Sequence, residues 1–197
     1  MRHAATVTPE TKSDVRKAIR ARRRTRVALP DEGIRIADLV MSLDEVQQAC
    51  TRNAAVTCFA SRPEEPDTAP LRAVLREAGA TVLLPVVSGD SLLWAVDDPL
   101  TSRVNAMNIQ EPTGPPADEV PAVWIVPALA VDRAGWRLGQ GGGYYDRALT
   151  SPRLTPAALV AAIIFDEELL PVVPHDNHDQ RVDAVVTPSD VHRLTAR

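Results

Sequence analysis

Short apolar runs recur along this chain between residues 54 and 188, and each is bounded by polar or turn-forming residues. These runs are AAVTCFA (54–60), TVLLPVV (81–87), LLWAV (92–96), AVWIVPAL (122–129), LVAAIIF (159–165) and DAVVTP (183–188). Several are apolar at consecutive positions rather than at alternate ones, which is typical of strands covered on both faces of a sheet. We therefore expect a central sheet with helices on both sides.

Helical segments precede and separate these runs. The segment TPETKSDVRKAIRARRRTR (8–26) offers Thr11 or Ser13 as an N-cap, and no glycine or proline occurs from residue 10 to residue 29. The segment EGIRIADLVMSLDEVQQAC (32–50) spaces its apolar residues for one helix face. LRAVLREAGA (71–80) lies between two expected strands, and the order strand, helix, strand predicts an α/β protein.

Length and composition favour one globular domain over residues 1–197. The chain is 45% apolar and 24% charged, as in ordinary folded proteins, and it contains no repeat or convincing linker. The segment NIQEPTGPPADEVP (108–121) has four prolines and no apolar period, which predicts an ordered surface loop or flap.

Several classes of protein are disfavoured by the pattern. The longest apolar run is far shorter than the roughly 20 residues that a membrane-spanning helix needs. The first residues lack the apolar segment of a secretory signal, so we expect a cytoplasmic protein. Two cysteines, Cys50 and Cys58, are too few for a disulfide framework and are expected in the core.

The stretch RLGQGGGYYDRAL (137–149) carries most of the chemistry. It follows an expected strand and the turn DRAG (132–135), and it leads into YYDRAL, which can start a helix. Glycines in that place can present backbone N–H groups to phosphate oxygens, with Arg137 adding a positive fork. The dinucleotide fingerprint fails at Tyr144, and a plain glycine-rich connection with packed tyrosines is the alternative. Asp146 is interpreted either as a helix cap or as a ligand of a cation beside phosphate.

Two further segments bear polar side chains that could bind ligands. In HDNHDQRVD (175–183), the prolines before His178 argue against a helical zinc site, so aspartates at a strand end are favoured as magnesium ligands. The basic segment RKAIRARRRTR (16–26) could bind nucleic acid, although a solvated helix face is favoured in a chain of net charge −4. Lys12 and Arg16 project from one helix face and could reach a polyphosphate.

Together these segments resemble the 5-formyltetrahydrofolate cyclo-ligase family. The most specific match is VPALAVDRAGWRLGQGGGYYDRAL (126–149) in one uninterrupted register. Weaker matches follow in the same order as in the family: KSDVR (12–16), EPDT (65–68), NIQEP (108–112) and HDQRVDAVVT (178–187). The resemblance implies a three-layer α/β/α open sheet, mostly parallel and Rossmann-like. It also implies ATP-dependent cyclisation of 5-formyltetrahydrofolate to 5,10-methenyltetrahydrofolate, with release of ADP and phosphate.

The resemblance also implies roles for individual residues. It assigns catalytic roles to Arg137, Tyr144 and Asp146, and magnesium binding to Asp146 and Asp179. It assigns ATP contacts to Lys12, Arg16, Arg137, Leu138, Gly139, Gln140, Gly141, Gly142, Gly143, Tyr144 and Tyr145. It assigns the folate pocket to Arg16, Ala60, Glu65, Gln140, Gly141, Gly142, Gly143 and Tyr144.

Two positions depart from the family pattern: Glu168 replaces a common glutamine, and Val131 replaces a common aromatic residue. Two other functions stay open from the residues alone. One is another phosphate-binding α/β enzyme, such as a sugar-phosphate isomerase, and the other is a non-enzymatic folate or nucleic-acid binding module. We expect a monomer that binds neither nucleic acid nor a membrane.

Overall fold

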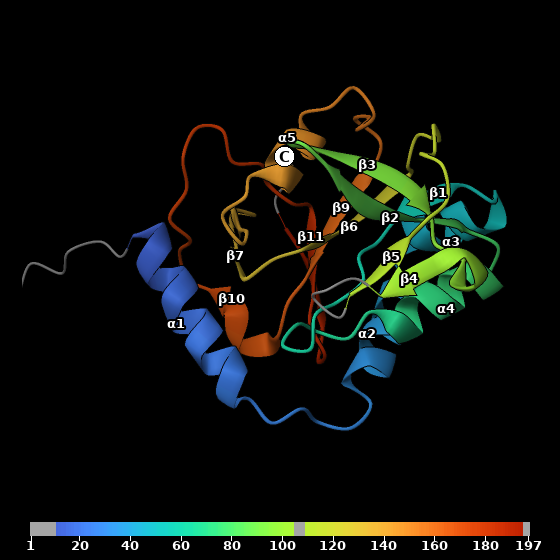
Figure 1. The fold of residues 1–197 in the computed structure, drawn as a ribbon. Helices are drawn as coiled ribbons and strands as arrows, with labels where there is room; N and C mark the ends of the chain where they lie inside the picture. The colour runs from blue at the N-terminus through green and yellow to red at the C-terminus, as the bar shows by residue number, and fades with distance from the viewer. Residues whose placement is uncertain (1–10, 105–108, 195–197) are drawn as a thin grey trace, which may run out of the picture.

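A mostly parallel sheet forms the centre of the computed structural model, which describes residues 11–104 and 109–194 (Figure 1). In these residues the sheet has seven strands in the order β12-β11-β9-β6-β1-β2-β3. Neighbouring strands are parallel except at the two edges, where β12 and β3 run antiparallel to β11 and β2. The strands are β1 (Ala55–Thr57), β2 (Thr81–Ser88), β3 (Ser91–Val96), β6 (Val123–Pro127), β9 (Leu159–Ile163), β11 (Ala184–Val186) and β12 (Val191–Arg193). The α/β fold class is confirmed, and each expected apolar run contains a strand.

Three helices cover one face of the sheet: α2 (Glu32–Met41), α3 (Asp44–Thr51) and α4 (Ala69–Glu77). Their apolar faces pack with the strands into one core that includes Ile36, Val46 and Leu71. The expected single segment over 32–50 is two helices. The chain becomes extended at Leu43 (ψ 129°), which keeps Leu43 itself buried while α3 takes a new direction.

The opposite face is covered by the short helix α5 (Tyr144–Leu149) and by connecting segments. Trp94 and Trp124 meet edge to face there, with ring centroids 5.4 Å apart. A three-stranded sheet of β7 (Ala130–Asp132), β8 (Arg137–Leu138) and β10 (Leu169–Leu170) extends from this layer. The expected DRAG turn forms between β7 and β8, where the Gly135 amide donates to the Asp132 carbonyl at 2.9 Å.

Helix α1 (Lys12–Thr25) lies beside the small sheet rather than on the central one (Figure 1). Thr11 is its N-cap, and Thr11 and Asp14 satisfy each other's backbone amides. Val15 and Ile19 are its buried apolar residues, and they pack with Leu129 and Leu138. The basic segment is thus mostly the solvated side of a helix whose narrow apolar stripe docks it.

The structure also describes part of the proline-rich segment and both cysteines. Part of the proline-rich segment is a strand, because β5 (Gln110–Pro112) pairs with β4 (Ser102–Val104); Asn108 lies outside the described residues. Two 3₁₀ turns, η1 (Pro99–Thr101) and η2 (Asp166–Glu168), complete the regular elements. Cys50 and Cys58 are buried free thiols, as expected. Within the described ranges, no helix has the length and apolar character that crossing a membrane requires.

Candidate functional site

A cavity of about 720 Å³ opens where the parallel strands β1 and β6 end. Phe59 and Ala60, just after β1, and Pro127 and Ala128, at the end of β6, form its floor. The chain leaves β1 for β2 on one side of it, whereas β6 lies on the other side, so the strand order reverses here. Open α/β sheets bind ligands in the crevice at such a reversal.

All residues assigned to the site from the sequence line this one cavity. They are Lys12, Arg16, Ala60, Glu65, Arg137, Leu138, Gly139, Gln140, Gly141, Gly142, Gly143, Tyr144, Tyr145, Asp146 and Asp179. Segments separated by more than a hundred residues therefore meet at one place. Their individual roles remain predictions.

Close packing explains why the loop at 139–143 is rich in glycine. A Cβ at Gly142 would come within 2.9 Å of the Tyr144 ring, and one at Gly143 would come within 2.7 Å of Arg147 Nη1. Gly141 and Gly143 also have positive φ angles of 108° and 67°. Within the described part of the chain, the amides of residues 141–143 donate no hydrogen bond to another protein group. They are therefore available to a ligand in the cavity.

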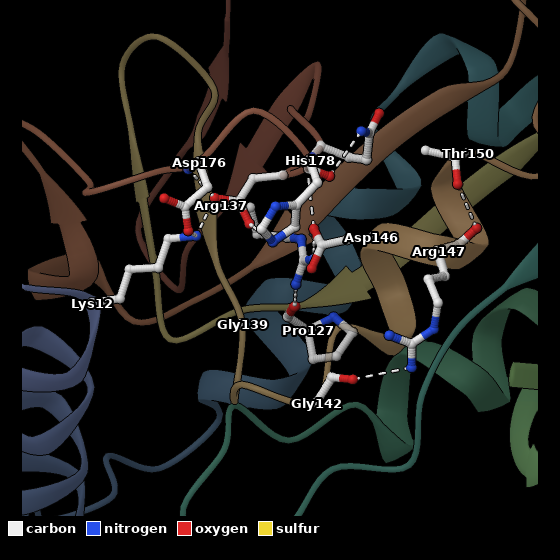
Figure 2. Close-up of polar contacts among 12 residues, drawn as sticks. Lys12, Pro127, Arg137, Gly139, Gly142, Asp146, Arg147, Thr150, Asp176 and His178 are labelled. Carbon is white, nitrogen blue, oxygen red and sulfur yellow. Dashed lines mark hydrogen bonds and ion pairs between the residues drawn. The ribbon is translucent and has the colours of Figure 1, made fainter. Parts of the chain in front are cut away.

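Arg137 lines the cavity as a buried and paired side chain (Figure 2). Its Nη2 donates to Asp146 Oδ1 at 2.7 Å, and its Nη1 donates to the Pro127 carbonyl at 3.3 Å. The same Asp146 oxygen accepts from the Gln180 amide at 3.3 Å. Asp146 does not cap α5, whose N-cap is Gly143, so the helix-cap interpretation is wrong. Arg137 instead orients the Asp146 carboxylate at the cavity wall.

Lys12 joins the start of α1 to the loop that carries Asp176 and Asp179 (Figure 2). Its Nζ donates to Asp176 Oδ2 at 2.6 Å and also to Asp179 Oδ2. Burial would lower the pKa of Lys12, but the hydrogen bonds that Lys12 donates to both carboxylates outweigh this effect and raise that pKa. Burial likewise opposes ionisation of Asp179, yet the Lys12 and Asp176 hydrogen bonds hold the pKa of Asp179 below its usual range. Both groups are thus charged at neutral pH.

The two histidines of the same loop lie in different surroundings. His175 stacks on Trp136, with ring centroids 3.8 Å apart, whereas the His178 side chain is 76% exposed at the cavity rim. Among the described residues, no group of three or more His, Cys, Asp or Glu side chains is arranged to hold a metal ion. A cation here would need ligands from a substrate as well.

Glu65 connects the loop after β1 to the glycine loop. Its Oε1 accepts from Gln140 Nε2 at 3.2 Å, and its Oε2 accepts from the Arg62 amide at 3.0 Å. Arg16 Nε donates to the Gly139 carbonyl at 2.9 Å on the other side of that loop. The carboxylate of Glu65 is therefore held in place at the cavity wall.

The two tyrosines of the motif occupy different positions. The Tyr145 ring packs edge to face against Trp94 at 6.3 Å, and burial raises the pKa of its hydroxyl. The Tyr144 hydroxyl lies 3.4 Å from the Gly89 carbonyl. Tyr144 is the outer of the two and borders the cavity beside Gly142.

Sequence reasoning missed two groups of residues at this site. Arg20 donates to the Gln140 carbonyl at 2.7 Å, one helical turn beyond Arg16, and the i, i+4 spacing was the available signal. The β2–β3 hairpin and the segment before β5 supply an apolar wall, and its residues were assigned only to strands and a flap. That wall comprises Leu84, Pro85, Val87, Leu92 and Ile109.

Comparison with known proteins gives consistent results along nearly the whole chain. The sequence model described as the 5-formyltetrahydrofolate cyclo-ligase family matches residues 8–188. A 5-formyltetrahydrofolate cyclo-ligase of Mycolicibacterium smegmatis is 34% identical over 192 residues, covering 92% of this chain and 96% of that protein. The Escherichia coli K12 protein of the same name is 35% identical over 182 residues, covering 86% and 97%.

Solved structures agree with the sequence comparison. The NMR structure of the 5,10-methenyltetrahydrofolate synthetase of Aquifex aeolicus superposes with a TM-score of 0.74 at 27% identity, covering 93% of this chain and 92% of that one. The corresponding synthetase of Mycoplasma pneumoniae shares the fold, with a TM-score of 0.66 at 17% identity, covering 91% and 99%.

Proposed function

The chain belongs to the 5-formyltetrahydrofolate cyclo-ligase family. From this premise we propose how its cavity binds ATP and 5-formyltetrahydrofolate and catalyses the reaction between them. The family's reaction is a ligation that forms a carbon–nitrogen bond at the expense of ATP. The single observation that carries the proposal is the convergence of the glycine loop, two cation–carboxylate pairs and an apolar wall on one cavity.

The formyl group of the substrate must be activated before N10 can attack its carbon. The N5 formyl group is an amide, so its carbon is a poor electrophile and its oxygen a poor leaving group. We propose that the formyl oxygen attacks the γ-phosphorus of ATP and ADP departs. N10 then attacks the formyl carbon, the carbon–oxygen bond to phosphate breaks, and the N10 proton is lost. The result is the 5,10-methenyl ring.

The polar side of the cavity suits the phosphates of ATP. Phosphoryl transfer depends mainly on positioning and on neutralising charge. The unpaired amides of residues 141–143 offer several donors in one region, and Lys12 and Arg16 border the cavity from α1. The described hydrogen bond of Arg16 goes to a neutral carbonyl and not to a carboxylate, so no acidic side chain of the described residues offsets its charge.

The acidic residues fit a magnesium ion only in combination with a nucleotide. Asp146 uses Oδ1 for Arg137 and Gln180, and its Oδ2 has no partner among the described residues. Mg²⁺ is commonly held by one or two carboxylates together with substrate phosphates and water. We propose that Asp146 and Asp179 hold it, and that it neutralises the charge of the phosphates when bound.

The remaining side of the cavity suits the flat pterin. The apolar side chains of the β2–β3 hairpin form one wall, and Glu65 lines the cavity between this wall and the glycine loop. A carboxylate is a suitable partner for the adjacent N–H groups of a pterin ring. We propose that Glu65 anchors the pterin by hydrogen bonds and is not a general base.

The proposal is tested by following the near-ultraviolet absorbance of the methenyl product with purified protein. Product should require 5-formyltetrahydrofolate, ATP and magnesium together. Asp146→Asn should raise the magnesium concentration needed for half-maximal rate and lower turnover, whereas Asp38→Asn on the exposed side of α2 should change neither. Folded wild-type protein that forms no product would contradict the function, and an unchanged magnesium requirement in Asp146→Asn would contradict the metal assignment.

A further inference from the structure

Arg147 is an arginine of α5 to which neither the sequence motif nor the proposed chemistry assigns a task. Its guanidinium turns back toward the glycine loop, where Nη2 donates to the Gly142 carbonyl at 3.0 Å (Figure 2). Its Nε donates to the Asp90 carbonyl at 2.7 Å. One planar group thus holds the backbone of two segments that are more than fifty residues apart.

These two segments form different sides of the cavity. Gly142 belongs to the loop whose unpaired amides are proposed to receive ATP. Asp90 and Gly89 form the two-residue turn of the β2–β3 hairpin, since Ser88 pairs directly with Ser91. The apolar wall proposed for the pterin lies on this hairpin. Arg147 therefore connects the ATP side of the site to the folate side.

Arg147 also packs against an aromatic side chain of the same motif. The Arg147 Cζ atom lies 5.0 Å from the centroid of the Tyr144 ring, and a Cβ at Gly143 would approach Nη1 to 2.7 Å. The Tyr144 hydroxyl reaches the same hairpin turn at the Gly89 carbonyl. Gly143 itself is favoured by its positive φ of 67°.

The partners of Arg147 indicate a structural task rather than charge neutralisation. In the described ranges its guanidinium contacts two carbonyl oxygens and an aromatic ring, and no carboxylate lies within ion-pair distance. Carbonyl oxygens bridged by one guanidinium are fixed relative to each other, because its donors have a rigid planar arrangement. A lysine carries the same charge but lacks the rigid planar set of donor nitrogens, so it would not hold the two carbonyls at the same separation.

We propose that Arg147 is a positioning residue that holds the glycine loop against the tip of the β2–β3 hairpin. This one contact would fix the position of the ATP side of the cavity relative to the folate side. This inference rests on the proposed function, because it takes the loop as the ATP site and the hairpin as the pterin wall. It does not make Arg147 a catalytic residue.

The test compares Arg147→Gln and Arg147→Lys with wild type in steady-state kinetics, varying each substrate in turn. Both variants should raise the KM for ATP and the KM for the folate substrate by about tenfold, since neither Gln nor Lys provides the rigid planar donors that join the two segments. Arg193→Gln is the matched control, because Arg193 also makes two side-chain hydrogen bonds at a half-exposed position, to Glu45 away from the cavity. It should leave both KM values unchanged.

Thermal unfolding of the same proteins separates positioning from general destabilisation. Arg147 is exposed on its helix, so both variants should fold and unfold within a few degrees of wild type. The proposal is overturned if Arg147→Lys keeps both wild-type KM values, because charge would then suffice. It is also overturned if only one KM changes, or if only the unfolding temperature does. Wild-type protein that forms no product would instead contradict the proposed function.

Discussion

At the scale of single residues, the glycine loop shows two physical demands acting on the same positions. A Cβ at Gly142 would collide with the Tyr144 ring, and Gly143 has a positive φ of 67° that favours glycine. The same positions have backbone amides without a protein partner among the described residues. A loop that binds phosphate through amides must be both open and held in shape, and here neighbouring aromatic and guanidinium groups provide the support.

Glu65 allows a direct test of which residue contacts the pterin. Glu65→Gln keeps the size of the side chain but loses the negative charge and one of its two acceptor oxygens, so it can accept from Gln140 or from the Arg62 amide but not from both. We expect the KM for the folate substrate to rise about tenfold or more, with the KM for ATP and turnover nearly unchanged. The measurement is initial rate against each substrate.

The neighbouring Glu64 is the control for this prediction. It is exposed and does not line the cavity proposed for ATP and the folate, so Glu64→Gln should have wild-type kinetics. A Glu65→Gln enzyme that loses turnover at saturating folate would contradict the anchoring role and would favour acid–base participation instead.

The site residues could be predicted from the sequence to the extent that they lie in one contiguous motif. Arg137 through Asp146 are adjacent in the chain, so their presence at one site follows from local order alone. The partners of these residues could not be predicted. The contact of Arg147 with Asp90 and that of Lys12 with Asp176 depend on how distant segments pack, and no local pattern encodes that packing.

At the scale of elements, the apolar runs predicted six of the seven described strands of the central sheet, but not β12, the short strands outside that sheet or the helix break. Consecutive apolar residues identify buried strands because both faces must be covered. The break between α2 and α3 has no glycine or proline to mark it, and it arises because Leu43 stays in the core while the chain turns. The pairing of β4 with β5 was hidden by the prolines around it.

The connection between α1 and α2 depends on an ion pair that makes stability sensitive to acid. Arg26, at the end of α1, pairs with Glu32 at the start of α2, and Glu32 also accepts from the Leu29 amide at 3.3 Å. The Arg26 hydrogen bond, which outweighs the opposing effect of burial, lowers the pKa of Glu32. Its pKa is therefore lower in the folded chain than in the unfolded one.

The sign of the pH dependence follows from this difference. Near the unfolded pKa of about 4.3 the unfolded chain binds more protons at Glu32, so the stability contributed by the pair is present above that pH and is lost as pH falls through the lower folded value. We expect Glu32→Gln to lower the unfolding temperature by about 2 °C or more at neutral pH. The gap from wild type should shrink below about pH 4.

Unfolding temperatures measured between neutral and acidic pH check this expectation. Glu77→Gln, at the exposed end of α4, is the control and should give no pH-dependent gap. A gap for Glu32→Gln that stays constant, or that widens toward low pH, would show that the pair does not stabilise the folded chain through ionised Glu32.

At the scale of the whole molecule, the cavity is assembled from parts of the chain that lie far apart in the sequence. Helix α1, the loop after β1, the β2–β3 hairpin, the glycine loop and the loop at 175–180 each supply one side of it. The floor, at the ends of β1 and β6, and the β2–β3 wall belong to the central sheet, whereas helix α1 and loops supply the other sides. Segments of this kind open locally more easily than core strands, because they bury fewer apolar contacts.

Hydrogen exchange should therefore report ligand binding as protection of several distant segments at once. With a non-hydrolysable ATP analogue and magnesium, we expect slower exchange in residues 12–16, 139–145 and 175–180 together, since these surround the proposed phosphate site. The β2–β3 turn should gain protection as well, because Arg147 ties it to Gly142. Helix α3 and strand β12, which do not line the cavity, serve as the internal reference and should not change. Protection confined to the glycine loop would show that the nucleotide does not bring these segments together, and the cavity would then be a set of independent walls rather than one site that closes around its substrates.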